Sequence, residues 1–162
     1  MSARVRIQYE DFDLSHEVQT LRAGDLRVGA VCSFVGTVRD AQSLSGKVQD
    51  EIHALELEHY PGMTEAAIER MIDEAMQRFH VYQTRVVHRI GRLLPADQIV
   101  LVVVTSAHRG ESFKACEFLM DYLKTQAPFW KKEFTQAGAT WVDARAADDA
   151  ALARWGIDSR NA

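Results

Sequence analysis

The sequence is poor in the residues that small folds use as covalent or metal staples. It has two cysteines, Cys32 and Cys116, which lie far apart with no Cys-x-x-Cys spacing or Cys/His cluster around either. This arrangement argues against a disulfide framework and against a zinc site of the usual spacing. We therefore expect two plain buried thiols, and the sequence predicts no metal site and no bound cofactor.

Long hydrophobic segments are also missing. The longest uninterrupted apolar run is Ile99 to Val104, whereas a membrane-spanning helix needs roughly 20 apolar residues. The first residues, MSARVRIQYEDF, alternate like a strand and contain no apolar segment of the kind that marks a secretion signal. We therefore expect no membrane association and a cytoplasmic location.

An excess of positive charge is absent as well. The chain has 19 lysines and arginines against 23 acidic residues, a net charge of −4. A general nucleic-acid binder would carry a basic stripe, so we expect no nucleic-acid partner and only a local anion site. The loops G-x-G-x-x-G, Walker A and G-x-S-x-G do not occur, which removes support for those kinds of nucleotide binding and for serine-hydrolase chemistry.

What remains is the composition of a globular protein, 47% hydrophobic and 26% charged in 162 residues. Residues 1–162 are expected to form a single domain. Polar, turn-rich residues 40–51 predict a loop. Hydrophobic periodicity predicts an α+β fold with one mixed or mostly antiparallel sheet. The expected helices span about 15–22, 64–79, 108–127 and 147–155, and the expected strands 5–9, 28–39, 52–60, 84–91, 98–107 and 129–134, with a hairpin around Gly138.

Several single residues predict local features. Ser15 and Thr64 precede helical stripes and are candidate N-caps. Gly36 lies inside a strand pattern and indicates a bulge or a close backbone approach. Pro128 disfavours helical geometry at Ala127 and should end the third helix.

Lysines crowd around aromatic residues where that helix ends. Lys124 belongs to its last turn, where the carbonyl ends of a helix already favour a cation. A lysine near apolar surface or a second cation, here Lys131, also loses its proton more readily and suits a general base or nucleophile. If the next segment is extended, Trp130 and Lys132 share one face and Lys131 takes the other. Phe129 and Trp130 complete the aromatic surroundings.

Three further cations follow predicted strands. Arg39 ends one strand, and His108 and Arg109 follow another. Strand ends often hold ligands, and an arginine fork suits phosphate or carboxylate, although exposed loop charges are common without any such role. The remaining histidines lack metal-ligand spacing and are interpreted as structural or solvated. They are His16, His53, His59, His80 and His88.

Five motifs in the right order resemble one family over about residues 28–145. They are FVGTVRD (34–40), LELEHYPGMTE (55–65), HRIGRL (88–93), TSAHR (105–109) and CEFLMDYLKTQAPFWKKE (116–133). They resemble the large, catalytic subunit of molybdopterin synthase, a sulfurtransferase of molybdenum cofactor biosynthesis. The Lys-x-x-x-Pro-x-Trp-Lys-Lys-Glu ending is the most specific part.

The resemblance implies a reaction and partners. A cyclic pyranopterin monophosphate would receive two sulfurs and become the dithiolene molybdopterin. The sulfur would come from a small ubiquitin-like subunit whose C-terminal Gly-Gly carries a thiocarboxylate. The implied fold is an α/β hammerhead with an added antiparallel sheet. The implied assembly is a heterotetramer, with a central homodimer of this chain and one small subunit at each end.

The resemblance also assigns roles. The essential lysine of the family matches Lys124 and its second important lysine matches Lys131. The pterin and phosphate pocket matches Arg39, His108 and Arg109, shared across the dimer. We further expect Phe129 and Trp130 to wall the channel for the Gly-Gly tail.

Two departures and two alternatives stand beside this reading. Residues 40–42, Asp-Ala-Gln, differ from the usual pair after the strand arginine, so no pterin contact is assigned there, and Glu111-Ser112 are also unusual. The residues alone also fit a non-catalytic subunit that binds a phosphorylated ligand or serves as a partner scaffold. A third possibility is an interaction module that uses the surface of Phe129 and Trp130.

Overall fold

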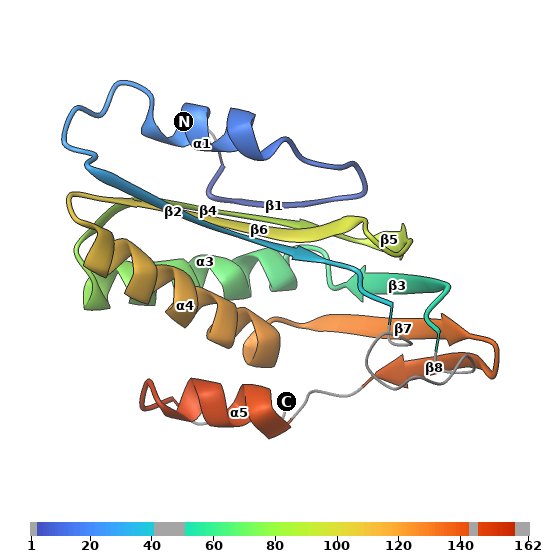
Figure 1. The fold of residues 1–162 in the computed structure, drawn as a ribbon. Coiled ribbons are helices and arrows are strands. Elements are labelled where there is room, and N and C mark those ends of the chain that lie inside the picture. Colours follow the sequence, from blue (N-terminus) through green and yellow to red (C-terminus); the bar gives the residue numbers. More distant parts are fainter. Residues whose placement is uncertain (1–2, 41–50, 143–145, 158–162) are drawn as a thin grey trace.

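The computed structural model describes residues 3–40, 51–142 and 146–157. Two four-stranded sheets dominate it (Figure 1). In the first, called sheet A, β1 pairs with β4 in parallel and the other neighbours are antiparallel. Its order is β1 (Val5–Gln8), β4 (Val81–Arg89), β6 (Gln98–Ser106) and β2 (Ala30–Thr37).

Helices cover both faces of sheet A. Figure 1 shows α1 (Leu14–Arg22) on one face, and α3 (Met63–Arg78) and α4 (Arg109–Gln126) on the other. The short helix α5 (Ala146–Ala153) packs against α4. Strand β6 lies inside sheet A and is buried over most of its length, as consecutive apolar residues favour for a strand covered on both faces.

The alternation of side chains along β4 and β6 divides the core into two layers. Val86, Val102 and Val104 face α3 and α4 and belong to the larger cluster. Val87 and Leu101 face α1 and belong to a smaller one. Because a strand presents successive side chains to opposite faces, this division is what a doubly covered sheet requires.

The second sheet, called sheet B, extends from one end of sheet A and is antiparallel throughout. The α+β fold with an additional antiparallel sheet, which the resemblance implies, is therefore confirmed. The single sheet expected from hydrophobic periodicity is wrong, because the described strands pair as two separate sheets. The predicted loop lies outside the described residues at positions 41–50. Sheet B has the order β5 (Gly91–Leu93), β3 (Ala54–His59), β7 (Phe129–Thr135) and β8 (Gly138–Val142).

The two predicted N-caps are wrong. Helix α1 is capped by Asp13, whose carboxylate accepts from the His16 N–H at 2.9 Å, and Ser15 lies inside the helix. Helix α3 is preceded by Gly62 at φ 83°, a left-handed conformation that favours glycine. The Glu65 carboxylate accepts from the Gly62 N–H at 2.7 Å, while the hydroxyl of Thr64 is used for a contact described below.

Both readings of Gly36 are confirmed. The pairing of β2 with β6 shifts register between Gly36 and Thr37. A Cβ at Gly36 would lie 2.8 Å from Val100 Cγ1, which is too close for two carbon atoms that are not bonded.

The two thiols only partly follow the expectation, since Cys116 is buried and Cys32 is half-buried. Burial, together with the neighbouring Cys32 thiol that shares a hydrogen bond with it, raises the pKa of the Cys116 thiol well above its usual range. Cys116 therefore stays protonated and is a poor nucleophile.

A buried ion pair fastens α1 to sheet A. The Glu17 carboxylate is 3% exposed and accepts from Arg85 Nη1 at 2.7 Å, and it also pairs with Arg6. Removing one member of such a pair leaves a buried charge without its counterion, which costs far more than losing an exposed pair.

We expect Glu17→Ala to lower the free energy of unfolding by about 3 kcal/mol or more, measured by denaturant titration. Glu117→Gln is the control, because it weakens the exposed pair with Arg154 and should change stability little. Equal effects of the two substitutions would contradict the structural role of Glu17.

Candidate active site

The end of α4 and the start of β7 place the two candidate lysines. Lys124 lies exposed in the last turn of α4, and the chain leaves the helix at Ala127. Strand β7 begins at Phe129, directly after Pro128. The predicted helix end and the extended segment after it are both confirmed.

Strand β7 separates its side chains onto two faces of sheet B. Directly opposite residues in antiparallel strands share a face, and Phe129 lies opposite His59 while Lys131 lies opposite Leu57. Trp130 lies opposite Glu58 on the other face. The predicted alternation is confirmed, and one consequence is that Phe129 and Trp130 do not form a continuous wall.

The Trp130 face of sheet B is aromatic and cationic. The Trp130 ring packs edge-on against Tyr60 with centroids 4.5 Å apart. Lys132 Nζ lies 5.2 Å from the ring centroid of Trp141 on β8. A cation over an aromatic ring is attracted by its quadrupole, so Lys132 has a structural reason to be there.

Thr64 ties the α4–β7 junction to the start of α3. Its hydroxyl accepts from the Tyr60 N–H and donates to the Pro128 carbonyl, both at 3.0 Å, and the residue is fully buried. Because the bond reaches Pro128, it holds the backbone between Lys124 and Lys131. The sequence pattern suggested a cap here and missed this role.

His88 and His59 also reach this region, which sequence reasoning missed. The His88 ring on β4 stacks on Phe129 with centroids 3.8 Å apart and planes 18° apart. His59 Nε2 lies 3.5 Å from the Glu65 carboxylate. Neither histidine has metal-ligand spacing. Both occur in motifs that resemble the family, HRIGRL and LELEHYPGMTE, and these motifs could have marked them as residues near the site.

The environment of His88 keeps its ring neutral. Burial, with smaller contributions from the charges of His59 and Lys124, lowers the pKa of His88 to about 4, against a hydrogen bond to the Arg89 carbonyl that acts the other way. The carbonyl can only accept, so Nδ1 donates in that 2.8 Å bond and Nε2 carries the lone pair.

The three predicted anion ligands do not meet within one chain. Arg39 follows β2, and His108 and Arg109 follow β6, which runs antiparallel to β2 with Ala30 opposite Ser106. These residues therefore lie at opposite ends of sheet A. Fifteen residues along α4 put Arg109 about 22 Å from the level of Lys124.

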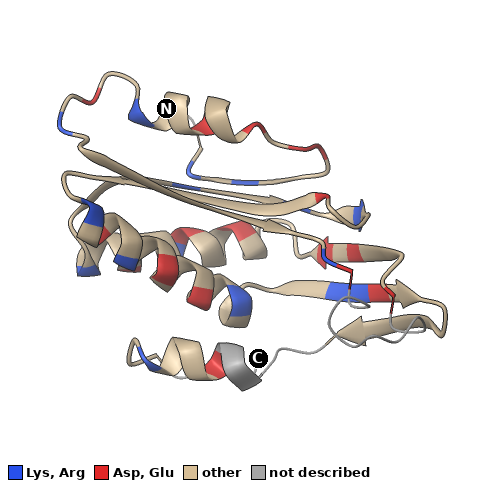
Figure 2. Cartoon of the chain, viewed as in Figure 1, with Lys and Arg blue, Asp and Glu red and all other residues tan. Residues whose placement is uncertain are grey.

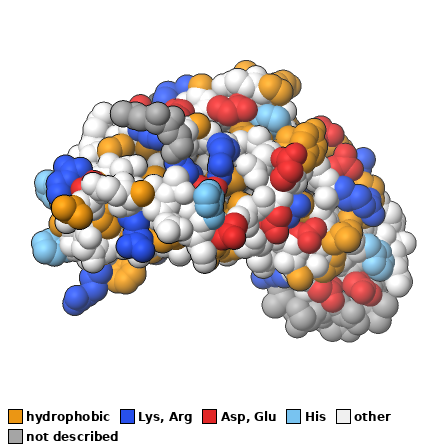
Figure 3. Space-filling model, turned by 90° about the horizontal axis from the view of Figure 1, so that it is seen from above, with side chains coloured by type: hydrophobic (Ala, Val, Ile, Leu, Met, Phe, Trp, Pro, Cys, Tyr) orange, Lys and Arg blue, Asp and Glu red, His pale blue; other side chains and the backbone are white. Residues whose placement is uncertain are grey.

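Charge is spread over the molecule in keeping with this separation. Basic residues occur at both ends of α4 and on β7 (Figure 2). On the face seen in Figure 3, basic and acidic side chains are interspersed and neither sign covers a continuous area. The described residues contain no group of three or more His, Cys, Asp or Glu that could hold a metal ion.

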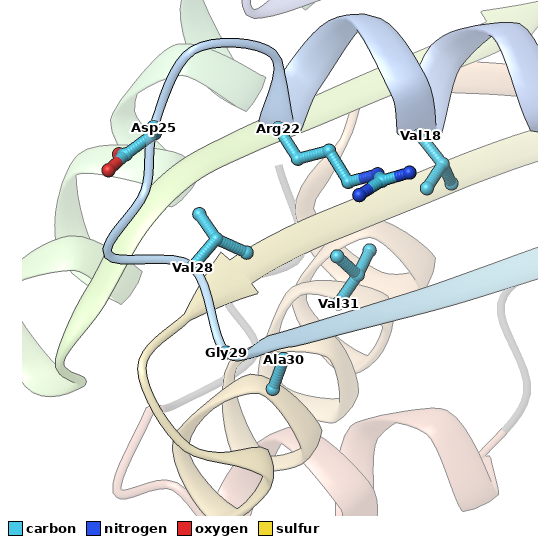
Figure 4. Close-up of a pocket in the computed structure, with 7 residues that line it drawn as sticks. All are labelled: Val18, Arg22, Asp25, Val28, Gly29, Ala30 and Val31. Carbon is cyan, nitrogen blue, oxygen red and sulfur yellow. The ribbon is translucent and has the colours of Figure 1, made fainter.

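An open pocket of about 410 Å³ lies away from these residues, on the α1 side of sheet A (Figure 4). Val18, Val28 and Val31 supply aliphatic walls, and Arg22 extends across it. The Asp25 carboxylate is paired with Arg27. The pocket contains none of the predicted site residues.

Comparisons with known proteins decide the family. The family model described as "MoaE protein" matches residues 7–126. The chain belongs to the MoaE family. A relative from Ralstonia nicotianae, named molybdopterin synthase catalytic subunit, is 58% identical over 158 residues, covering 98% of this chain and 87% of the relative.

Solved structures of the family agree with the fold. The MoaE protein of Burkholderia ambifaria has a TM-score of 0.80 at 55% identity, covering 97% of this chain and 100% of that chain. A molybdopterin synthase chain from Staphylococcus aureus has a TM-score of 0.78 at 29% identity, covering 88% and 99%. In the part of this MoaE-family chain that the structure describes, no helix is long and apolar enough to cross a membrane.

A pH titration tests the surroundings of His88. Between pH 6.5 and about 4 an unfolded chain protonates this histidine and the folded chain does not, so His88 makes the protein less stable as pH falls through that window. We expect its ring signals in NMR to titrate near pH 4. The stability of His88→Phe should lack this part of the acid dependence, and a titration of the native ring near pH 6.5 would contradict the assignment.

Proposed function

We propose that this chain is the catalytic subunit of a molybdopterin synthase. It transfers sulfur from a thiocarboxylated small subunit to cyclic pyranopterin monophosphate and thereby forms the dithiolene of molybdopterin. The observation that carries the proposal is the junction of α4 and β7, where Lys124 and Lys131 flank Pro128 and Phe129 in a chain similar over nearly its whole length to curated catalytic subunits.

In this proposal Lys124 contacts the thiocarboxylate carbonyl. Sulfur transfer develops negative charge on oxygen and sulfur and releases a carboxylate. A fixed cation aimed at that group stabilises the transition state more than the ground state. Lys131 supplies a second positive charge from β7, on the sheet face that also carries Phe129.

Phe129 and Trp130 contribute to the tail channel in different ways. Phe129 shares the Lys131 face and borders the reacting end of the tail, whereas Trp130 with Tyr60 lies on the other face and contacts the small subunit nearer the channel mouth. The tail itself is thin because Gly-Gly has no side chains, which suits a narrow channel.

The pterin phosphate would be bound by cations from two copies of the chain. Arg39 belongs to the end of sheet A at which sheet B begins, and His108 and Arg109 belong to the other end. A symmetric central dimer can bring the far end of one copy to Lys124 of the other. We accordingly propose a homodimer within a heterotetramer, each copy a single domain over residues 1–162. We also propose a cytoplasmic location, which suits the free thiols of Cys32 and Cys116.

The first test is reconstitution from purified chain, cyclic pyranopterin monophosphate and thiocarboxylated small subunit. We expect product from wild type and a loss of at least about 100-fold in kcat for Lys124→Ala, with fold and small-subunit binding retained. Lys114→Ala is a matched control, since Lys114 lies exposed on the same helix. Binding of both ligands by wild type without product would favour a non-catalytic binding subunit.

Mixing two inactive variants tests the shared pocket. A dimer of one Lys124→Ala chain and one Arg109→Ala chain has one site with both residues intact. Random reassembly should therefore restore about a quarter of wild-type activity. No restoration, with mixed dimers demonstrated by mass spectrometry, would place Lys124 and Arg109 of the same chain in one site.

A further inference from the structure

A neutral aromatic ring lies under the tail-binding residue Phe129, and nothing in the proposed chemistry uses it. His88 projects from β4 on the face of sheet A that packs against α3 and α4, opposite Val100 and beside Val86 of the larger core cluster. Phe129 belongs to sheet B but packs against the same cluster. The stack of His88 on Phe129 is thus a contact between the two sheets.

The ring of His88 is held from several sides. Its Nδ1 donates to the Arg89 carbonyl at 2.8 Å, which fixes the orientation of the ring about its own side chain. The charged or titratable groups that act on it are Lys124 from α4 and His59 from β3. From β6 and β1 the residues opposite are apolar, Val100 and Ile7.

Two hydrogen bonds to backbone carbonyls fix the course of the chain through the junction. Thr64 holds the Pro128 carbonyl, and the Phe129 N–H donates to the Ala127 carbonyl at 2.8 Å. These bonds set the course of the chain, but they leave the side-chain torsions of Phe129 to be decided by what packs against its ring. His88 provides a flat, nearly parallel surface at van der Waals distance for that purpose.

We propose that His88 is a positioning residue, whose stacked imidazole holds the Phe129 ring where the small subunit's Gly-Gly tail passes on its way to Lys124. The inference rests on the proposed function, because it needs the tail to run along Phe129. Its chemistry is packing and not proton transfer. A neutral ring also adds no like charge beside Lys124, whereas a protonated one would.

Three substitutions separate the stack from the hydrogen bond. His88→Phe keeps the aromatic surface and loses the nitrogen donor. His88→Asn keeps a donor near the Arg89 carbonyl and loses the ring. His88→Leu fills the space without an aromatic face. It replaces His88→Asn in the test if the smaller asparagine prevents folding. His80→Ala is the matched control, because His80 is exposed just before the opposite end of the same strand.

The measurement is steady-state kinetics of the full chain. The concentration of the thiocarboxylated small subunit is varied, and the subunit binds the chain during turnover. His88→Leu and His88→Asn should raise KM for the small subunit about 3- to 10-fold with kcat changed less than about 2-fold. His88→Phe and His80→Ala should stay close to wild type. A rise in KM with little change in kcat, restored to wild type by His88→Phe, is not expected from a general loss of folded protein, which would lower the apparent kcat.

Two other results would overturn the inference. Wild-type KM in His88→Leu and His88→Asn would show that the stack does not matter for the tail. A large fall in kcat for all three variants, His88→Phe included, would assign the nitrogen to the chemistry instead. If wild type itself gives no product, the proposed function fails, and that outcome is distinct from either of these.

A second readout needs no turnover. Lys124→Gln removes a charge that opposes protonation of His88, so the NMR titration of the ring should move upward from about pH 4, while Lys114→Gln should leave it unchanged. An unchanged titration in Lys124→Gln would place the Lys124 ammonium too far from His88 for the geometry of the inference.

Discussion

The double burial of β4 and β6 is the constraint on which the rest of the structure depends. Their side chains contribute to both core clusters, and a slip of β4 by one residue would carry Arg85 from its ion pair with Glu17 on the α1 face into the apolar layer under α3 and α4. A fixed register in these strands fixes where α4 starts, directly after β6, and hence where its last turn ends. The place of Lys124 is therefore set by the core and not by contacts of its own.

The second constraint is the junction between the sheets. Pro128 ends the helix, Thr64 holds its carbonyl, and the His88 ring supports the residue that follows. The Thr64 and His88 contacts come from different segments of the chain, α3 and β4, so two long-range contacts converge on adjacent residues. Such convergence makes the junction rigid, and a rigid junction suits the proposed role of holding a thin tail in one geometry.

Much of this could be predicted from the sequence, for identifiable reasons. The stripe of α3, the apolar run of β6 and the alternation in β7 are local patterns, and the structure follows them. The caps failed because Ser15 and Thr64 were judged on residue type, whereas Asp13 and Gly62 meet the geometry. The supports of the site were missed because Thr64, His59 and His88 reach it only through long-range pairing.

The candidate site shows the same limit. Lys124 and Lys131 are near in sequence and their common junction could be predicted from Pro128. The separation of Arg39 from His108 and Arg109 follows only from the antiparallel pairing of β2 with β6, which no local pattern reveals. The placement of Phe129 and Trp130 on opposite faces follows from the alternation predicted for the strand, although the two residues were expected to form one wall.

The distribution of tryptophans gives the molecule two separate optical reporters. Trp130 and Trp141 are exposed on one face of sheet B, on either side of Lys132. Trp155 is partly buried against the core and donates to Asp121 of α4 at 2.8 Å. Fluorescence from the first two is open to aqueous quenchers and follows events on sheet B. Emission from Trp155 is shielded and follows the seating of the C-terminal segment on α4.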